Sequence, residues 1–150
     1  SDLALDEAKG GAQRKLLFPD ATSFESQSAP AVEGLNSVYK ADTGAWVFDV
    51  TSAQGYHGDV ELMVGINADG TVAGIQVVAE DETDGIGTNA LTEEYFGGFA
   101  GSPAAGELTV DEAGAGQTHV DAVSGATFTS RAVVDCLNIA FAAYAQMGGN

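Results

Sequence analysis

Three successive β-rich segments in the middle of the chain restrict it to folds built around a sheet. Residues 45–52 (AWVFDVTS) are rich in aromatic and β-branched side chains, which favour a pleated, half-buried surface. Residues 60–66 (VELMVGI) and 71–80 (TVAGIQVVAE) flank the tetrad NADG, and Asp-Gly between two apolar runs is typical of a β-hairpin. A shorter run at 37–41 (SVYKA) adds a fourth candidate strand. The sequence therefore predicts a twisted, mainly antiparallel sheet.

The segment from Ser130 to Met147 is the clearest helix. Its apolar side chains recur at a spacing of three and four residues, the period of a helix with one buried face. These residues are Val133, Val134, Leu137, Ala140, Phe141 and Tyr144. A weaker amphipathic helix is expected at 3–18, ended by Pro19, and residues 19–36 are expected to be irregular.

Shorter elements complete the expected fold. Residues 91–99 (LTEEYFGGF) predict one or two helical turns with Thr92 as the N-cap. Residues 107–110 and 118–123 are interpreted as short strands around a Gly/Ala-rich turn. A length of 150 residues suits one domain. We therefore expect a single α+β domain, with the long C-terminal helix packed on the sheet and a weaker N-terminal helix.

Composition limits the partners and cofactors. The chain carries 22 acidic and 5 basic residues, a formal net charge of −17, and such a field repels nucleic acid and anionic lipid. An alternative explanation for the whole charge imbalance is solubility or adaptation to salt. Cys136 is the only cysteine, so it can form no intramolecular disulfide, and we expect it to be buried. His57 and His119 lack neighbouring ligands for zinc, and no metal site is expected.

A hydroxyl-rich turn stands directly before the C-terminal helix. Residues 121–130 (DAVSGATFTS) contain four Ser or Thr hydroxyls and one glycine. Ser and Thr before a helix usually cap it, yet the first turn of a helix also binds phosphate well. Gly125 permits close approach of the backbone, and Arg131, the only Lys or Arg after Lys40, offers a cationic partner. These residues alone leave a helix cap and an anion site both open.

Two motifs resemble those of a known family. Residues 121–127 (DAVSGAT) resemble the D-x-x-[ST]-G-A-T motif of FMN-binding domains, and residues 82–87 (ETDGIG) resemble their E-T-P-G-L-G segment. Residues 55–78 resemble the Gly-Tyr-x-Gly turn and hairpin that precede it, and order and spacing agree over residues 35–145. The family includes the G subunit of the Rnf electron-transport complex and the C subunit of the sodium-pumping NADH:quinone reductase.

The resemblance implies covalent FMN, joined through its phosphate to Thr127 by a flavin transferase. The motif that the transferase reads is then Asp121, Ser124, Gly125, Ala126 and Thr127. The cofactor-binding residues expected on this basis are Ser124, Gly125, Ala126, Glu82, Thr83, Gly85, Ile86, Gly87 and Tyr56. We add Leu91 as part of an apolar slot for the ring and Arg131 as a phosphate contact. Asp84 replaces the proline of the second motif, which removes a fixed φ and adds a negative charge.

The resemblance also implies a role and a place in the cell. The chain would be an electron-carrier subunit of a membrane-bound, ion-translocating complex, with no turnover of its own. Its partners would be the other subunits and, during maturation, the flavin transferase. It would lie on the extracytoplasmic face of a bacterial membrane, tethered by an N-terminal helix absent from this chain. Residues 1–36 would form the N-terminal helix and irregular segment, and residues 37–150 the FMN-binding domain.

Two alternatives stay open. One is an extracellular, non-enzymatic binding module whose Ser-Gly-Ala-Thr turn caps a helix or holds a small anion. The other is a flavin domain of a larger reductase.

Overall fold

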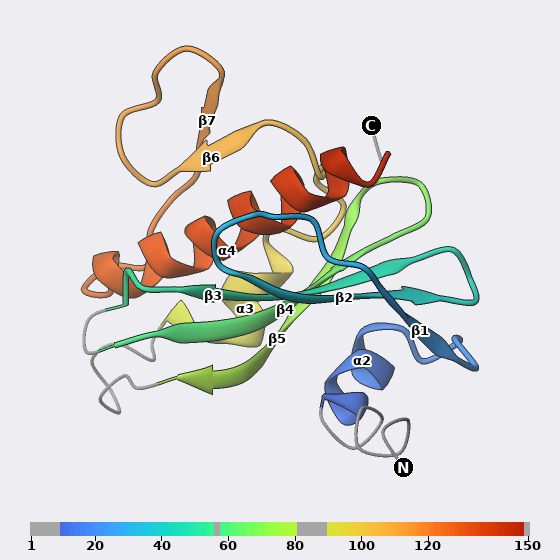
Figure 1. Cartoon of the computed structure of the whole chain (residues 1–150). Coiled ribbons are helices and arrows are strands. Elements are labelled where there is room, and N and C mark those ends of the chain that lie inside the picture. Colours follow the sequence, from blue (N-terminus) through green and yellow to red (C-terminus); the bar gives the residue numbers. More distant parts are fainter. Residues whose placement is uncertain (1–9, 56–57, 81–89, 149–150) are drawn as a thin grey trace.

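The computed structural model describes residues 10–55, 58–80 and 90–148, and Figure 1 shows their arrangement. Five antiparallel strands form one sheet in the order β1-β2-β3-β4-β5, so each strand pairs with its neighbour in the chain. Antiparallel neighbours need only short connections, which suits this order. The strands are β1 (Phe24–Gln27), β2 (Leu35–Ala41), β3 (Trp46–Ser52), β4 (Val60–Ile66) and β5 (Val72–Glu80).

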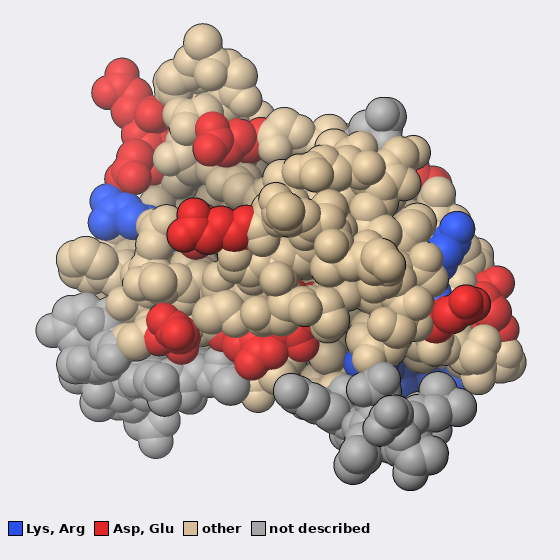
Figure 2. Space-filling view, viewed as in Figure 1, with Lys and Arg blue, Asp and Glu red and all other residues tan. Residues whose placement is uncertain are grey.

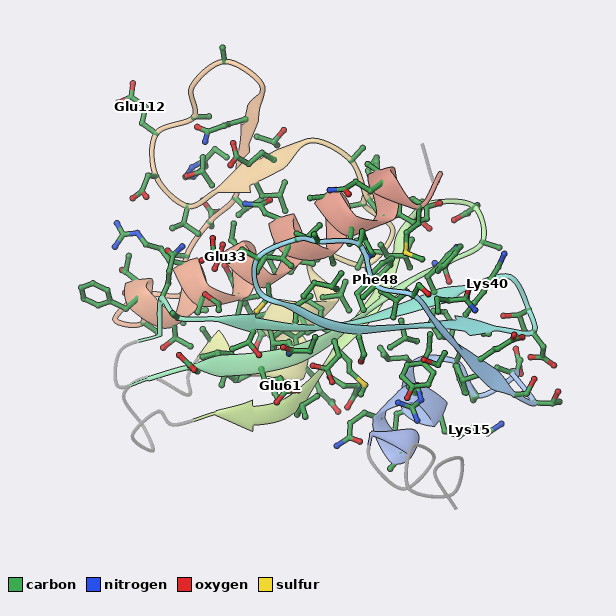
Figure 3. The ribbon with its side chains drawn as sticks, viewed as in Figure 1. Lys15, Glu33, Lys40, Phe48, Glu61 and Glu112 are labelled. Carbon is green, nitrogen blue, oxygen red and sulfur yellow. The ribbon has the colours of Figure 1, made fainter. Side chains whose placement is uncertain are left out.

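Helix α4 (Thr127–Gln146) lies across one face of this sheet and packs chiefly on β3 and β4 (Figure 1). Leu137 of α4 and Phe48 of β3 are both fully buried, and Figure 3 labels Phe48. Trp46 stacks on Phe48 with ring centroids 6.2 Å apart, and Tyr144 meets Phe48 edge-on at 6.3 Å. This apolar interface is the centre of the core, and it fixes the axis of α4 relative to the sheet.

Helix α2 (Gly11–Leu17) covers the opposite face, where two glycines leave room for it. Gly65 of β4 pairs with Gly74 of β5. A Cβ atom at Gly65 would lie 3.0 Å from the ring of Phe18, which is tighter than ordinary van der Waals contact. The buried Arg14 of α2 places its guanidinium carbon 3.9 Å from the centre of the Tyr39 ring, a cation–π contact that holds α2 against β2.

The N-terminal region differs in part from the expectation. Within the described residues the helix expected at 3–18 runs from Gly11 to Leu17. The expectation that 19–36 is irregular is wrong at β1, which pairs with β2. Its sequence FESQ holds one apolar residue, Phe24, so no alternating pattern indicates a strand. Phe24 packs on a small buried cluster of Ala21, Ala41 and Ala45.

The short elements before α4 are arranged differently from the expectation as well. Strands β6 (Glu107–Thr109) and β7 (Gln117–His119) form a separate parallel pair. The strand expected at 118–123 is shorter and ends at His119. Residues 120–126 then connect it to the start of α4 at Thr127. The expected helical turn is confirmed as α3 (Glu93–Gly97), whose N-cap is Thr92.

These elements confirm a single α+β domain with a long C-terminal helix on a mainly antiparallel sheet. Among the helices of the described residues, none is long and apolar enough to span a membrane.

We expect Leu137→Ala to lower the free energy of unfolding by about 2–5 kcal/mol, because it opens a cavity between α4 and the sheet. Leu16→Ala is the matched control, since Leu16 is 67% exposed and such surface changes stay within about 0.5 kcal/mol. Urea unfolding followed by circular dichroism measures both. Equal losses for the two variants would contradict this description of the core.

Cys136 should react with a thiol reagent only after unfolding. Its side chain is fully buried, and burial raises the pKa of the thiol, so the reactive thiolate is scarce in the folded protein. Labelling with a chromogenic disulfide reagent in buffer and in guanidinium chloride checks this. Fast labelling in buffer would show that α4 leaves the sheet easily.

Candidate functional site

The turn before α4 presents its hydroxyls to solvent. The N–H of Ala126 donates to the carbonyl of Val123 at 3.0 Å, and Gly125 has a φ of +78° with open space around its α-carbon. Ser124 and Thr127 are exposed. The N-cap position falls on Ala126, and no side chain caps this end of the helix. The alternative that this turn serves as a helix cap is therefore wrong.

The backbone of the turn is held by two hydroxyl groups, those of Ser130 and Tyr95. Ser130 is fully buried in α4. Its hydroxyl accepts the N–H of Val123 at 3.0 Å and donates to the carbonyl of Ala126 at 2.8 Å. The phenol of Tyr95, on α3, donates to the carbonyl of Asp121 at 2.8 Å. The two residues fix the turn while the hydroxyls of the motif itself stay exposed.

Helix α3 also forms one wall of a groove beside the turn. The hydroxyl of Thr92 accepts the N–H of Tyr95 at 3.2 Å, and the ring of Tyr95 meets that of Phe99 edge-on at 5.2 Å. The groove has a volume of about 1000 Å³, at the upper end of the range for small-molecule sites. Its lining residues are Thr92, Glu94, Tyr95, Gly98, Phe99, Ser102, Pro103, Ala105, Leu108, Thr118, His119, Val120, Asp121 and Val123. Because Asp121 and Val123 belong to the turn, groove and turn are continuous.

Arg131 makes an ion pair beside the turn. Its Nη2 lies 2.7 Å from Oδ1 of Asp111 and its Nε lies 3.2 Å from Oδ2. Hydrogen bonds from Arg131 hold the pKa of Asp111 below its usual value. The expected contact of Arg131 with a phosphate stays a prediction, and it would have to coexist with this bidentate pair.

His119 connects the same region by two polar contacts. Its Nδ1 lies 2.9 Å from the carbonyl oxygen of Asp111, and its Nε2 lies 3.3 Å from Oδ1 of Asp121. The hydrogen bond to Asp111, with a smaller contribution from Asp121, raises the pKa of His119. Protonated His119 therefore stabilises the folded state. This stabilisation is complete below the unfolded-state pKa of His119 and is lost as the pH rises through its folded-state pKa. Asp111 has the opposite dependence, and its effect is lost as the pH falls.

Figure 2 shows carboxylates spread over the face that it draws, with Lys and Arg near its ends.

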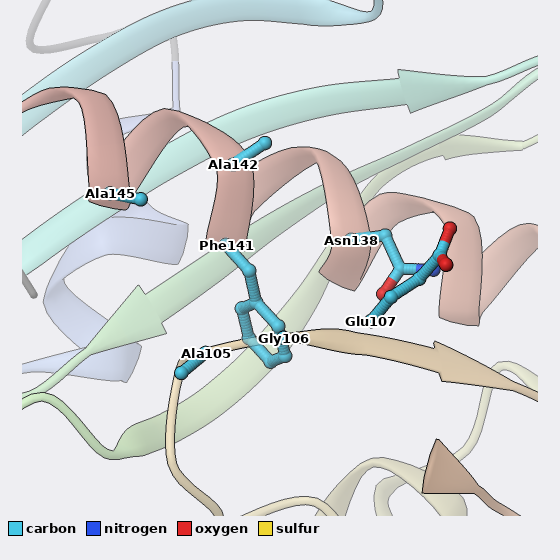
Figure 4. Close-up of a pocket in the computed structure, with 7 residues that line it drawn as sticks. All are labelled: Ala105, Gly106, Glu107, Asn138, Phe141, Ala142 and Ala145. Carbon is cyan, nitrogen blue, oxygen red and sulfur yellow. The ribbon is translucent and has the colours of Figure 1, made fainter. Parts of the chain in front are cut away.

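A second hollow, of about 390 Å³, lies along α4 away from the turn (Figure 4). It is lined mostly by small side chains, with Asn138 bonded to the backbone of Leu108. The described residues contain no group of three or more His, Cys, Asp or Glu that could hold a metal ion.

The structure describes one half of the predicted site. Asp121, Ser124, Gly125, Ala126 and Thr127 form the turn, and Leu91 packs half-buried against the core. The remaining predicted contacts lie outside the described residues, as does Asp84, and they stay predictions. They are Tyr56, Glu82, Thr83, Gly85, Ile86 and Gly87.

Sequence reasoning missed the roles of three residues at this site, Tyr95, Ser130 and Asp111. The segment around Tyr95 predicts only a helical turn, and Ser130 is one hydroxyl among several in a crowded segment. Nothing in the local sequence of Asp111 signals its pairing with Arg131, since the two are far apart in the chain.

Comparison with known proteins agrees with this geometry. The sequence model of the family described as "FMN-binding domain" matches residues 55–142. The G subunit of the Na(+)-translocating ferredoxin:NAD(+) oxidoreductase complex of Acetobacterium woodii is 30% identical over an alignment of 152 positions. This alignment covers 89% of this chain and 73% of that protein. The G subunit of the proton-translocating ferredoxin:NAD(+) oxidoreductase complex of Clostridium ljungdahlii is 34% identical, covering 79% of this chain and 63% of that protein.

A solved structure shares the fold. The C subunit of the Na(+)-translocating NADH-quinone reductase of Parabacteroides distasonis superimposes with a TM-score of 0.57 at 22% identity, covering 75% of this chain and 61% of that one. The family match extends from the loop after β3 through most of α4 and includes the whole Asp121–Thr127 turn. By its sequence, this chain belongs to the FMN-binding domain family.

Proposed function

We propose that this chain is an electron-transfer flavoprotein subunit of an ion-translocating oxidoreductase complex of the Rnf type, with FMN joined through its phosphate to Thr127. The observation that carries the proposal is the exposed Thr127 hydroxyl at the uncapped start of α4, within the sequence DAVSGAT and beside a groove of about 1000 Å³. The relatives named as G subunits of such complexes support it.

The residues present fit FMN. The first turn of α4 offers backbone N–H groups that no side chain caps, and such groups favour an anion. Gly125 leaves open space where a phosphate would approach. Tyr95, Phe99 and Val120 give the groove apolar walls that a flavin ring can contact. When bound, FMN supplies reversible acceptance and release of electrons, which the protein tunes through nearby charges and dipoles.

Attachment needs an activated donor, because a free phosphate has no good leaving group. The Thr127 hydroxyl oxygen would form the bond to the FMN phosphorus of flavin adenine dinucleotide. The phosphoanhydride bond of that donor breaks, AMP leaves, and the hydroxyl proton passes to a base of the flavin transferase. The phosphoester carries one negative charge less than a free phosphate. That suits a chain with a net charge of −17, whose Arg131 already pairs with Asp111.

The proposal includes a location and partners. The domain would lie on the extracytoplasmic face of a bacterial membrane, beside the other subunits of the complex, and would meet the flavin transferase during maturation. Electrons would pass between neighbouring redox centres through the flavin ring. The relatives, which are named as subunits of ion-translocating complexes, support the membrane complex and its other subunits as partners.

Thr127→Ala should abolish covalent flavin and leave the fold intact, because the side chain is exposed. The protein is produced with a flavin transferase, and its intact mass is measured. The parent should exceed its polypeptide mass by one FMN less one water, and the variant should show the polypeptide mass alone. Thr43→Ala, the same change in the exposed β2–β3 turn, should load like the parent. In-gel flavin fluorescence that survives denaturation of Thr127→Ala would refute the assignment.

Val120→Glu should loosen the flavin ring, since a carboxylate in the groove disfavours burial of an apolar ring beside it. In the FMN-carrying fraction we expect acrylamide to quench flavin fluorescence more strongly than in the parent, approaching its effect on free FMN. Ala142→Glu, which introduces the same side chain in the hollow of Figure 4, is the control and should not alter quenching. Equal quenching in the parent and both variants would place the ring elsewhere.

A further inference from the structure

We infer that Tyr95 and Ser130 are positioning residues, whose hydroxyls hold the Asp121–Ala126 backbone in the shape that presents Thr127 for FMN transfer. The inference rests on the proposed attachment of FMN at Thr127. It concerns two residues that the DAVSGAT motif does not contain, one on α3 and one near the start of α4.

The bonds of these two hydroxyls span the turn. Tyr95 holds the carbonyl of Asp121 at its start, at 2.8 Å. Ser130 holds the N–H of Val123 at 3.0 Å and the carbonyl of Ala126 at 2.8 Å. Each bond ends on a backbone atom, so the two residues fix the path of the chain and leave the side chains of the turn untouched.

The side chains of the motif do little to hold the shape of the turn. In the described part of the chain, no hydrogen bond is found from the side chain of Ser124 or Thr127, and both are exposed. Gly125, at a φ of +78°, has no side chain that could pack. The one backbone bond within the turn joins Val123 and Ala126. The shape of the turn therefore depends on contacts from outside it.

Ser130 does more than a usual helical serine. A hydroxyl bonded to the carbonyl four residues earlier is common in helices, and the bond to Ala126 is of this kind. The bond from the N–H of Val123 is different, because it ties α4 to the chain that leads into it. Ser130 is fully buried, so water has no ready access to replace that bond.

Tyr95 is itself held in place. Its backbone N–H bonds to the Thr92 cap, and its ring packs edge-on against Phe99. Burial raises the pKa of its phenol, with the neighbouring Ser130 hydroxyl opposing that shift and Asp121 adding to it. The phenol thus stays a hydrogen-bond donor over the working pH range. A ring fixed by packing gives its hydroxyl a defined position against the turn.

The consequence is kinetic. Transfer requires the Thr127 oxygen in line with the breaking phosphoanhydride bond, and a misplacement of about 1 Å can cost about a hundredfold in rate. Loss of either hydroxyl should therefore lower kcat for FMN incorporation. General destabilisation would instead reduce the amount of folded acceptor and raise the apparent KM.

The test uses purified protein, a flavin transferase and flavin adenine dinucleotide, with initial rates read from protein-bound flavin. We expect Tyr95→Phe and Ser130→Ala each to lower kcat by about ten- to a hundredfold with little change in KM. Faster hydrogen exchange of the Val123 amide in Ser130→Ala should accompany this. The matched controls are Tyr39→Phe on β2 and Ser52→Ala, a buried serine on β3 whose hydroxyl accepts the N–H of Gln54. Both should keep the parent kcat.

Three outcomes separate the possibilities. A parent kcat in both Tyr95→Phe and Ser130→Ala overturns the positioning role. The same loss in the controls overturns it as well, since the effect is then general. If the parent protein incorporates no flavin, or if Thr127→Ala does incorporate it, the proposed function is wrong instead. Tyr95→Phe keeps the ring, so the inference remains testable if Ser130→Ala does not fold.

Discussion

The burial of α4 on the central strands is the contact on which the rest of the molecule depends. Leu137 and Phe48 are fully buried in that interface, and Tyr144 packs edge-on against Phe48. Such a core is close-packed, so the helix cannot slide or rotate without opening voids. Its first residue, Thr127, is therefore fixed relative to the sheet. A functional group at the start of a buried helix gains a precise position from packing that lies many residues away.

Around that fixed helix, the turn combines a rigid backbone with free side chains. Ser130 and Tyr95 bond the backbone, whereas Ser124 and Thr127 face solvent. This division suits a residue that another protein must modify, because the reacting hydroxyl is accessible and its direction is set in advance. The adjacent groove then offers a place for a bulky group carried by that residue.

Much of this could be predicted from the sequence. Alternating apolar residues and the NADG turn predict the central strands. Apolar residues at a spacing of three and four predict α4. Each spacing is readable in the sequence because one face of the strand or helix is buried. Strand β1 could not be predicted in this way, because FESQ has no alternating apolar pattern. It forms a strand through its pairing with β2. The bonds from Tyr95 and Ser130 to the turn escape it for a similar reason: hydrogen bonds between distant segments leave no local signal. The motif, in contrast, can be recognised in the sequence because its residues are contiguous, and the structure places them in one turn before α4.

The attachment of FMN to Thr127 as a phosphoester is the proposal on which the assigned function depends. Peptide mapping by mass spectrometry, on wild-type protein produced with a flavin transferase, tests it most directly. We expect one modified peptide, which contains Thr127 and is heavier by one FMN less one water. Flavin on another peptide, or a loaded protein that releases all its flavin on denaturation, would contradict it.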